Sequence, residues 1–109
     1  DNELKIIKAN RFSVGGRSLR YRQGFDRKFN THTLALKKNT VVYLFSDGYM
    51  DQFGGKNRDK FNKPRFRDLI RKHIDLPMAS QKEIFVKELK KWKGAHTQTD
   101  DILLIGFRM

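Results

Sequence analysis

The sequence predicts an α+β domain in which antiparallel strands are flanked by helices. Two short runs, residues 40–46 and 102–109, are rich in Val, Ile, Leu, Tyr and Phe, which is typical of buried strands. Two longer segments, residues 64–74 and 80–93, place apolar residues at helical spacing with charged residues between them. The expected order is three strands, two helices and a last strand.

The first strand is expected over residues 3–9, which alternate loosely and contain two isoleucines. Gly15-Gly16 marks a turn. The basic residues 17–28 are expected to form a loop.

A hairpin is predicted next. Residues 29–36 alternate in the manner of a strand with one covered face. Lys37-Lys38-Asn39 forms a polar break, in which Asn39 tolerates a left-handed backbone. Residues 29–36 and 40–46 would then pair as antiparallel neighbours.

The middle of the chain predicts a short turn, a loop and a helix. Residues 49–53 are expected to form one helical turn, which Gly54-Gly55 ends. Residues 56–63 form a basic loop. Pro64 suits the first position of the helix that follows, since its fixed backbone angle is helical.

The second helix is predicted to begin at a capping box, in which Ser80 and Glu83 satisfy the free amides of the first turn. Its apolar stripe consists of Ile84, Phe85, Leu89 and Trp92. Gly94 ends the helix. Such an amphipathic helix packs on its own domain, so no membrane contact is expected.

Composition limits the class of protein. The 109 residues suffice for one small domain, and 38% hydrophobic with 12% aromatic residues can build a core. The chain has no Cys and no apolar run of about eighteen residues, which fits a cytoplasmic location. A net charge of +12 attracts nucleic acid, anionic lipid or an acidic partner. The basic residues are scattered, so a solvated surface is preferred and nucleic acid is the less favoured partner.

Aspartates mark the candidate site. Asp47 ends the strand over residues 40–46, and Gly48 lets the backbone turn. Asp100 and Asp101 begin the last strand. If these two strands are antiparallel neighbours, the carboxylates converge at one edge and need a hard cation such as Mg²⁺ or Mn²⁺. The alternative is an ordinary Asp-Gly turn and a polar loop end.

These segments, taken in order, resemble the C-terminal half of a metal-dependent serine/threonine protein phosphatase of the PPM type. The similarity is greatest to the bacterial branch named after the stage II sporulation phosphatase. It rests on YLFSDGYMDQFGG at residues 43–55, on Lys60-Phe61, on Trp92-Lys93-Gly94 and on QTDDILLIG at residues 98–106.

The resemblance implies an αββα fold, an antiparallel β-sandwich flanked by helices, with a two-metal site for Mn²⁺ or Mg²⁺. Asp47 and Asp100 match metal ligands of the family, Asp101 matches the neighbour of a ligand, and Gly48 would keep the turn open beside the metal. The implied reaction is attack of a metal-activated water on phosphoserine or phosphothreonine, with no catalytic residue beyond the metal ligands. Basic residues are expected to hold the phosphate, but the sequence does not single one out.

One departure from the family pattern is important. The family also requires aspartates on earlier strands, and neither Asp1 nor Asp26 matches them. Residues 1–109 are therefore interpreted as a single partial domain, the C-terminal portion of a phosphatase domain. Alone it is expected to bind metal weakly, to be inactive and to self-associate, because half a sandwich leaves apolar faces uncovered.

Further expectations follow from the resemblance. The substrate would be a phosphorylated signalling protein, for example an anti-sigma factor antagonist. Upstream sensory or signalling domains would control the phosphatase, which would be cytoplasmic, including as the cytoplasmic part of a membrane-bound sensor. Two alternatives stay open: a basic module that binds nucleic acid or an acidic protein, and a degenerate phosphatase-like interaction domain.

Overall fold

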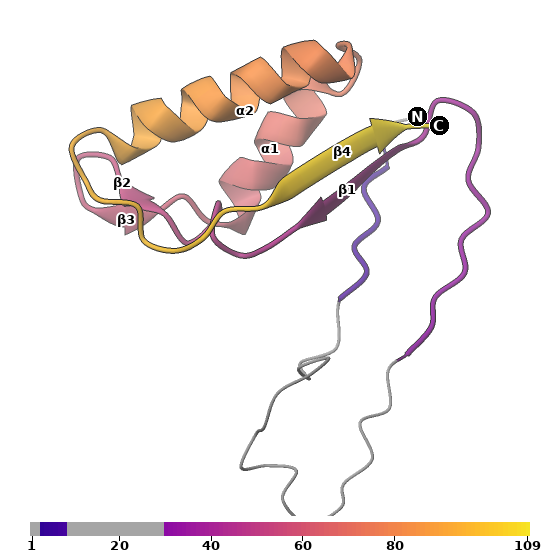
Figure 1. The fold of residues 1–109 in the computed structure, drawn as a ribbon, viewed down its shortest axis with the longest axis horizontal. Helices are drawn as coiled ribbons and strands as arrows, with labels where there is room; N and C mark the ends of the chain where they lie inside the picture. The colour runs from indigo at the N-terminus through magenta and orange to yellow at the C-terminus, as the bar shows by residue number, and fades with distance from the viewer. Residues whose placement is uncertain (1–2, 9–29) are drawn as a thin grey trace, which may run out of the picture. The chain divides into compact units, whose positions relative to one another are not determined.

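The structure is a computed structural model that describes residues 3–8 and 30–109 (Figure 1). The chain divides into two units, Asp1–Ala35 and Leu36–Met109. In the first unit, residues 3–8 have no regular secondary structure, so the strand predicted over residues 3–9 is wrong for its described part. The predicted turn at Gly15-Gly16 and the loop over residues 17–28 lie outside the described residues.

The predicted hairpin is also wrong. Residues 30–36 have no regular secondary structure and are exposed. An alternating pattern becomes a strand only where a neighbour pairs with its backbone groups, and in the described part of the chain β1 (Val41–Phe45) pairs with β4 (Leu104–Arg108) instead. The predicted polar break at residues 37–39 is present as a turn. Thr40 N donates to Lys37 O over 3.1 Å, and Asn39 adopts the predicted left-handed backbone with a φ of 71°.

The main sheet joins distant parts of the sequence. β1 and β4 pair antiparallel, with Val41 opposite Arg108 and Phe45 opposite Leu104. Backbone hydrogen bonds continue the pairing beyond both ends, at Asn39–Met109 over 3.2 Å and at Ser46–Leu103 over 3.0 Å. The two strands predicted from the apolar runs, and their antiparallel neighbourhood, are therefore confirmed.

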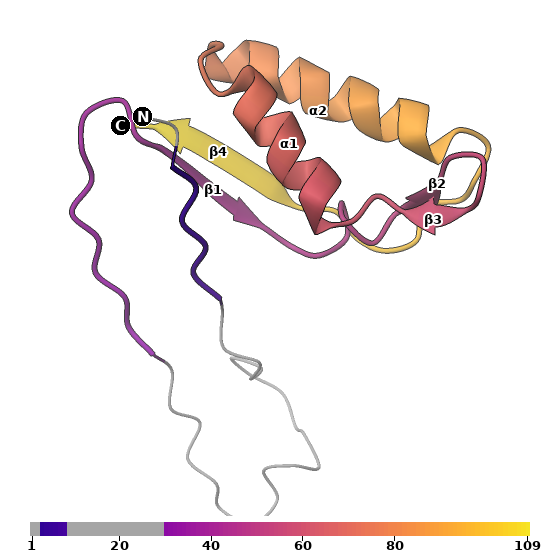
Figure 2. The same ribbon diagram turned by 180° about the vertical axis from the view of Figure 1, so that it is seen from behind.

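Two helices follow β1 in the sequence: α1 (Lys63–His73) and α2 (Met78–Lys93). Both lie on the same side of the β1–β4 pair (Figures 1 and 2). In α1, Pro64 lies in the first turn, and the Asn62 side chain caps the helix by accepting from Arg65 N at 3.0 Å. Gly94 ends α2 with a φ of 54°, as predicted.

The predicted capping box of α2 is wrong. The helix begins two residues earlier, at Met78, with Pro77 as its N-cap, so Ser80 lies inside the first turn. Gln81 is buried, and its amide nitrogen donates to Ile74 O at 3.2 Å and to Leu76 O at 3.0 Å. These bonds tie the start of α2 to the end of α1 and favour the earlier start.

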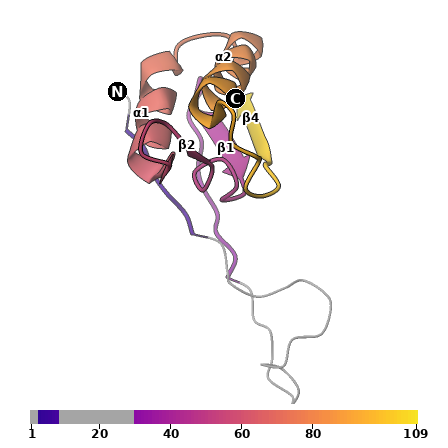
Figure 3. The same cartoon turned by 90° about the vertical axis from the view of Figure 1, so that its left-hand side faces the viewer.

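A second, two-stranded sheet was not predicted. β2 (Phe53–Gly54) pairs antiparallel with β3 (Asp59–Lys60). β2 lies where the predicted helical turn was expected to end, and β3 lies inside the predicted basic loop. Gly54 is required here, because a Cβ on it would lie 1.9 Å from Trp92 O. The hairpin thus packs against the C-terminal end of α2, which is seen end-on in Figure 3.

Tyr49 is at the centre of an aromatic core. Its ring centroid lies 5.2 Å from that of Phe61, 5.3 Å from Phe66 and 5.9 Å from Phe85. Its side chain is 2% exposed, and its hydroxyl donates to Phe85 O at 2.7 Å. Aromatic pairs at these separations add stability beyond the area they bury. The core therefore forms directly beside the turn that follows β1.

The face of the β1–β4 pair that points away from the helices is apolar, and no other element of the unit Leu36–Met109 covers it. Cross-strand partners share a face, and Leu44 and Ile105 are partners that are 55% and 47% exposed. Phe107, opposite Val42, is 42% exposed. Tyr43 and Phe45 point to the other side, where their rings meet Phe85 and Phe66. We name this surface, consisting of Val42, Leu44, Leu103, Ile105 and Phe107, the outer sheet face.

Among the described residues, neither helix is long and apolar enough to cross a lipid bilayer.

Candidate metal centre

The turn that carries Asp47 packs against the core on one side and is exposed to solvent on the other. Asp51 N donates to Asp47 O at 2.9 Å, which closes a turn over residues 47–51. The helical turn predicted over residues 49–53 is therefore misplaced by two residues, since Phe53 belongs to β2. Gly48, Tyr49 and Met50 are buried, whereas Asp47 is exposed. Burial, and secondarily the charge of Glu88, raises the pKa of the Tyr49 hydroxyl, so it stays a donor to Phe85 O at all physiological pH. Asp47 is therefore presented by a turn that the core holds in place.

Ser46 joins this turn to the start of β4. Its hydroxyl donates to Asp101 O at 3.3 Å and accepts from Leu103 N at 3.0 Å. Its own backbone nitrogen donates to Leu103 O at 3.0 Å. The end of β1 and the residues before β4 thus lie side by side, as antiparallel pairing of the two strands requires.

The turn after β1 and the residues before β4 also come into close contact at Gly48. A Cβ placed on Gly48 would lie 1.9 Å from Asp101 O and 2.8 Å from its carbonyl carbon. Only a residue without a side chain permits this contact. The structure therefore brings the backbone of Gly48 against that of Asp101, and Asp47 and Asp100 are their neighbours in the sequence.

We expect Gly48→Ala to destabilise the protein by roughly 1–3 kcal/mol, because the new methyl group overlaps a backbone carbonyl that cannot swing aside. Denaturant unfolding measures the change. Gly94→Ala provides a comparison without steric overlap, since a Cβ there meets nothing within 4 Å and its cost comes from the φ of 54° alone. A loss below about 0.5 kcal/mol in Gly48→Ala would show that the Gly48–Asp101 contact does not constrain the site.

Asp100 is held by the loop that precedes it. Its carboxylate accepts from Asp101 N at 2.7 Å, and its carbonyl accepts from the Gln98 side chain at 2.9 Å. The loop is anchored by Gln52, whose side chain accepts from Thr99 N at 3.0 Å and donates to Thr97 O at 2.8 Å.

Gln52 is a site-supporting residue that sequence reasoning missed. Its side chain is 0% exposed although it is polar. Its backbone carbonyl also accepts from Trp92 Nε1 at 2.9 Å and from Phe61 N at 2.9 Å. A buried polar side chain is retained when its hydrogen bonds are satisfied, and those of Gln52 link the Asp47 turn to the loop before Asp100. The sequence signal was a lone Gln between Asp51 and Phe53, which does not reveal partners over forty positions away.

The donor set fits a hard divalent cation in part. The described residues, 3–8 and 30–109, contain no group of three or more His, Asp or Glu side chains placed to hold a metal ion together. The three aspartates of the site nevertheless make no ion pair with Lys or Arg in that part of the chain, where the two ion pairs are Lys60–Asp51 and Arg71–Asp68. In a chain of net charge +12, unpaired carboxylates are available oxygen ligands. Metal binding at Asp47, Gly48, Asp100 and Asp101 stays a prediction.

Comparison with solved structures defines the class of the domain. The chain is similar to the SiaA-PP2C domain of Pseudomonas aeruginosa, with a TM-score of 0.62 and 40% sequence identity. The match covers 63% of this chain and 28% of that one. The α+β fold with antiparallel strands is thus confirmed, and it corresponds to part of a PP2C-type phosphatase domain.

The family itself is shown by sequence. Residues 22–109 match the family model of stage II sporulation protein E (SpoIIE), so the chain belongs to this family of PPM-type phosphatases. No curated protein matches the chain significantly. The resemblance predicted from the motifs around Asp47 and Asp100 is confirmed.

Proposed function

We propose that this chain supplies part of the metal centre of a protein phosphatase domain that hydrolyses phosphoserine or phosphothreonine on a signalling protein. One observation carries the proposal: the antiparallel β1–β4 pair brings the Asp47–Gly48 turn against the backbone of Asp101. Membership of the SpoIIE family supports the phosphatase class.

Each site residue has a defined part in this proposal. Asp47 and Asp100 would hold Mn²⁺ or Mg²⁺, with Asp101 beside them and Gly48 keeping the backbone close. The ions, when bound, supply a water of lowered pKa and positive charge for the phosphoryl group. Two carboxylates leave most of the coordination of two ions unfilled, and water, the substrate and further side chains would complete it.

The substrate is proposed in general terms. A signalling protein that carries a phosphorylated Ser or Thr fits the family, and an anti-sigma factor antagonist stays the specific prediction, with sensory domains as regulators. The cytoplasmic location also stays a prediction. The basic residues of the described part are spread over α1, α2 and the β2–β3 hairpin, so they do not favour nucleic acid over a phosphoprotein substrate.

The test is metal-dependent hydrolysis by the full-length protein. We expect Mn²⁺ to raise the thermal unfolding midpoint, because a ligand that binds only the folded state stabilises it, and to be required for phosphate release from a phosphoserine peptide. Excess EDTA should reverse both effects, and Ca²⁺ should not replace Mn²⁺ in turnover.

Other outcomes identify the alternatives. The basic binding module would be favoured if Mn²⁺ left the thermal unfolding midpoint unchanged and the protein released no phosphate. It should then bind oligonucleotides with an affinity that falls steeply as salt rises. Partner binding without metal binding or turnover would favour the degenerate interaction domain.

A further inference from the structure

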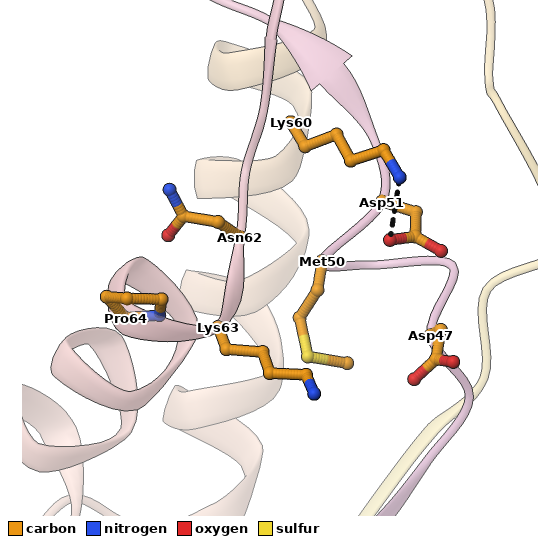
Figure 4. A pocket seen from close by; sticks show the side chains of 7 residues that line it. All are labelled: Asp47, Met50, Asp51, Lys60, Asn62, Lys63 and Pro64. Carbon is orange, nitrogen blue, oxygen red and sulfur yellow. Dashed lines mark ion pairs between the residues drawn. The ribbon is translucent and has the colours of Figure 1, made fainter.

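A pocket opens beside Asp47 and was not foreseen from the sequence. Its volume is about 460 Å³, and its walls come from the turn over residues 47–51, from Lys60 in β3 and from the first residues of α1. Figure 4 shows Asp47 on one side of this pocket and Lys63 on the other, with Met50 between them. The fold thus places side chains from three separate segments beside a predicted metal ligand.

The two lysines of the pocket differ in their partners. Lys60 Nζ lies 3.5 Å from Asp51 Oδ1, so its charge is already paired. Lys63 belongs to neither ion pair of the described residues, and neither does Asp47. The side chain of Lys63 extends toward the part of the pocket where Asp47 lies (Figure 4). One cation is therefore available there, and it is the side chain of Lys63.

The N-terminal end of α1 adds to the positive electrostatic potential in the pocket. Its first turn contains no acidic residue, whereas helices commonly place carboxylates there to complement the dipole. The Asn62 side chain satisfies Arg65 N but carries no charge.

The charge of the pocket depends on the metal. Asp47 and Asp51 balance Lys60 and Lys63, so the four charged side chains of the pocket cancel. A divalent cation on Asp47 would leave the pocket with excess positive charge, which favours an anion. A phosphate monoester carries such charge, and its oxygens accept from the three N–H groups of an ammonium.

We propose that Lys63 binds the phosphoryl group of the substrate beside the metal centre, while the Lys60–Asp51 pair keeps the wall of the pocket in place. The inference rests on the proposed function, because Asp47 must hold a cation for the pocket to attract an anion. It selects one residue among 24 Lys and Arg.

The test compares Lys63→Ala with Lys82→Ala in the full-length protein. Lys82 is an exposed lysine of α2 that does not line the pocket and makes no ion pair with the described residues, so both variants remove one surface charge. We expect Lys63→Ala to weaken binding of inorganic phosphate to the Mg²⁺-loaded protein by about tenfold, measured by calorimetric titration. The KM for a phosphoserine peptide should rise by a similar factor, and Lys82→Ala should change neither.

Two further measurements separate the possible failures. Stabilisation by Mn²⁺ should be the same in Lys63→Ala as in the unmodified protein, and Lys63→Arg should recover most of the phosphate affinity. If Mn²⁺ stabilises the protein and turnover occurs, but Lys63→Ala matches Lys82→Ala, the role of Lys63 is overturned and the proposed function stands. If the unmodified protein neither binds Mn²⁺ nor hydrolyses the peptide, the proposed function fails and the role of Lys63 fails with it.

Discussion

Asp47→Asn is expected to abolish the Mn²⁺-dependent rise in unfolding temperature and to lower phosphopeptide hydrolysis by roughly 100-fold or more. The amide keeps the size of the side chain but removes the negative charge that a divalent cation requires. Because Asp47 is exposed and makes no ion pair in the described part of the chain, the substitution should not disturb the fold. Thermal unfolding with and without Mn²⁺, together with phosphate release by the full-length protein, measures both effects.

Asp100→Asn should give the same result, because the two aspartates are predicted to serve one centre. Asp68→Asn is the matched control: Asp68 is an exposed residue of α1 whose partner, Arg71, lies 3.9 Å away. An exposed pair of this kind contributes little. Retention of the full Mn²⁺ effect in Asp47→Asn would refute Asp47 as a ligand, whatever the activity of the control.

Gln52→Leu is expected to lower the free energy of unfolding by about 3 kcal/mol, which is the largest effect on stability that we anticipate. Leucine fills a similar volume but offers no partner to Thr99 N, Thr97 O or Phe53 O, which the Gln52 side chain now contacts at 2.8–3.0 Å. The loop before Asp100 would lose its anchor, so Mn²⁺ stabilisation should weaken together with the fold. Denaturant unfolding and a Mn²⁺ titration report the two consequences separately.

Gln98→Leu is the control for Gln52→Leu. Gln98 is exposed on the same loop and makes one hydrogen bond, to Asp100 O. Exposed substitutions away from such anchors usually change stability by less than about 0.5 kcal/mol. A loss in Gln98→Leu as large as that in Gln52→Leu would mean that the loop, rather than the buried amide, is the sensitive element.

The sequence predicted the elements whose signals are local. The apolar runs of β1 and β4, Pro64 at the start of α1 and Gly94 at the end of α2 each act within a few residues, and all were found as expected. The strands predicted over residues 3–9 and 29–36 are absent from their described parts, residues 3–8 and 30–36. A strand needs a partner, and alternation does not identify one. The box of Ser80 and Glu83 failed because Gln81 bonds to the end of α1, a contact outside the local pattern.

For the candidate site, antiparallel pairing was expected to bring the carboxylates of Asp47, Asp100 and Asp101 to one edge of the sheet. The backbone contact between Gly48 and Asp101 agrees with this expectation. The described residues do not place the three carboxylates around one ion, so the predicted metal ligands stay a prediction. Gln52 and Lys63 were missed because their roles depend on segments that meet only in the folded chain. In a sequence with 24 Lys and Arg, nothing in the local pattern separates Lys63 from the other basic residues.

The outer sheet face affects how this protein should be engineered. A strand that is apolar on both of its sides is typical of a layer inside a larger body, and β1 has Tyr43 toward the helices and Leu44 away from them. Exchanging Leu44 or Ile105 for lysine would be a natural choice to make the isolated polypeptide more soluble. The predicted αββα sandwich has a second layer on this face, and a lysine there would place a charge against that layer, so variants selected for solubility should leave these positions unchanged.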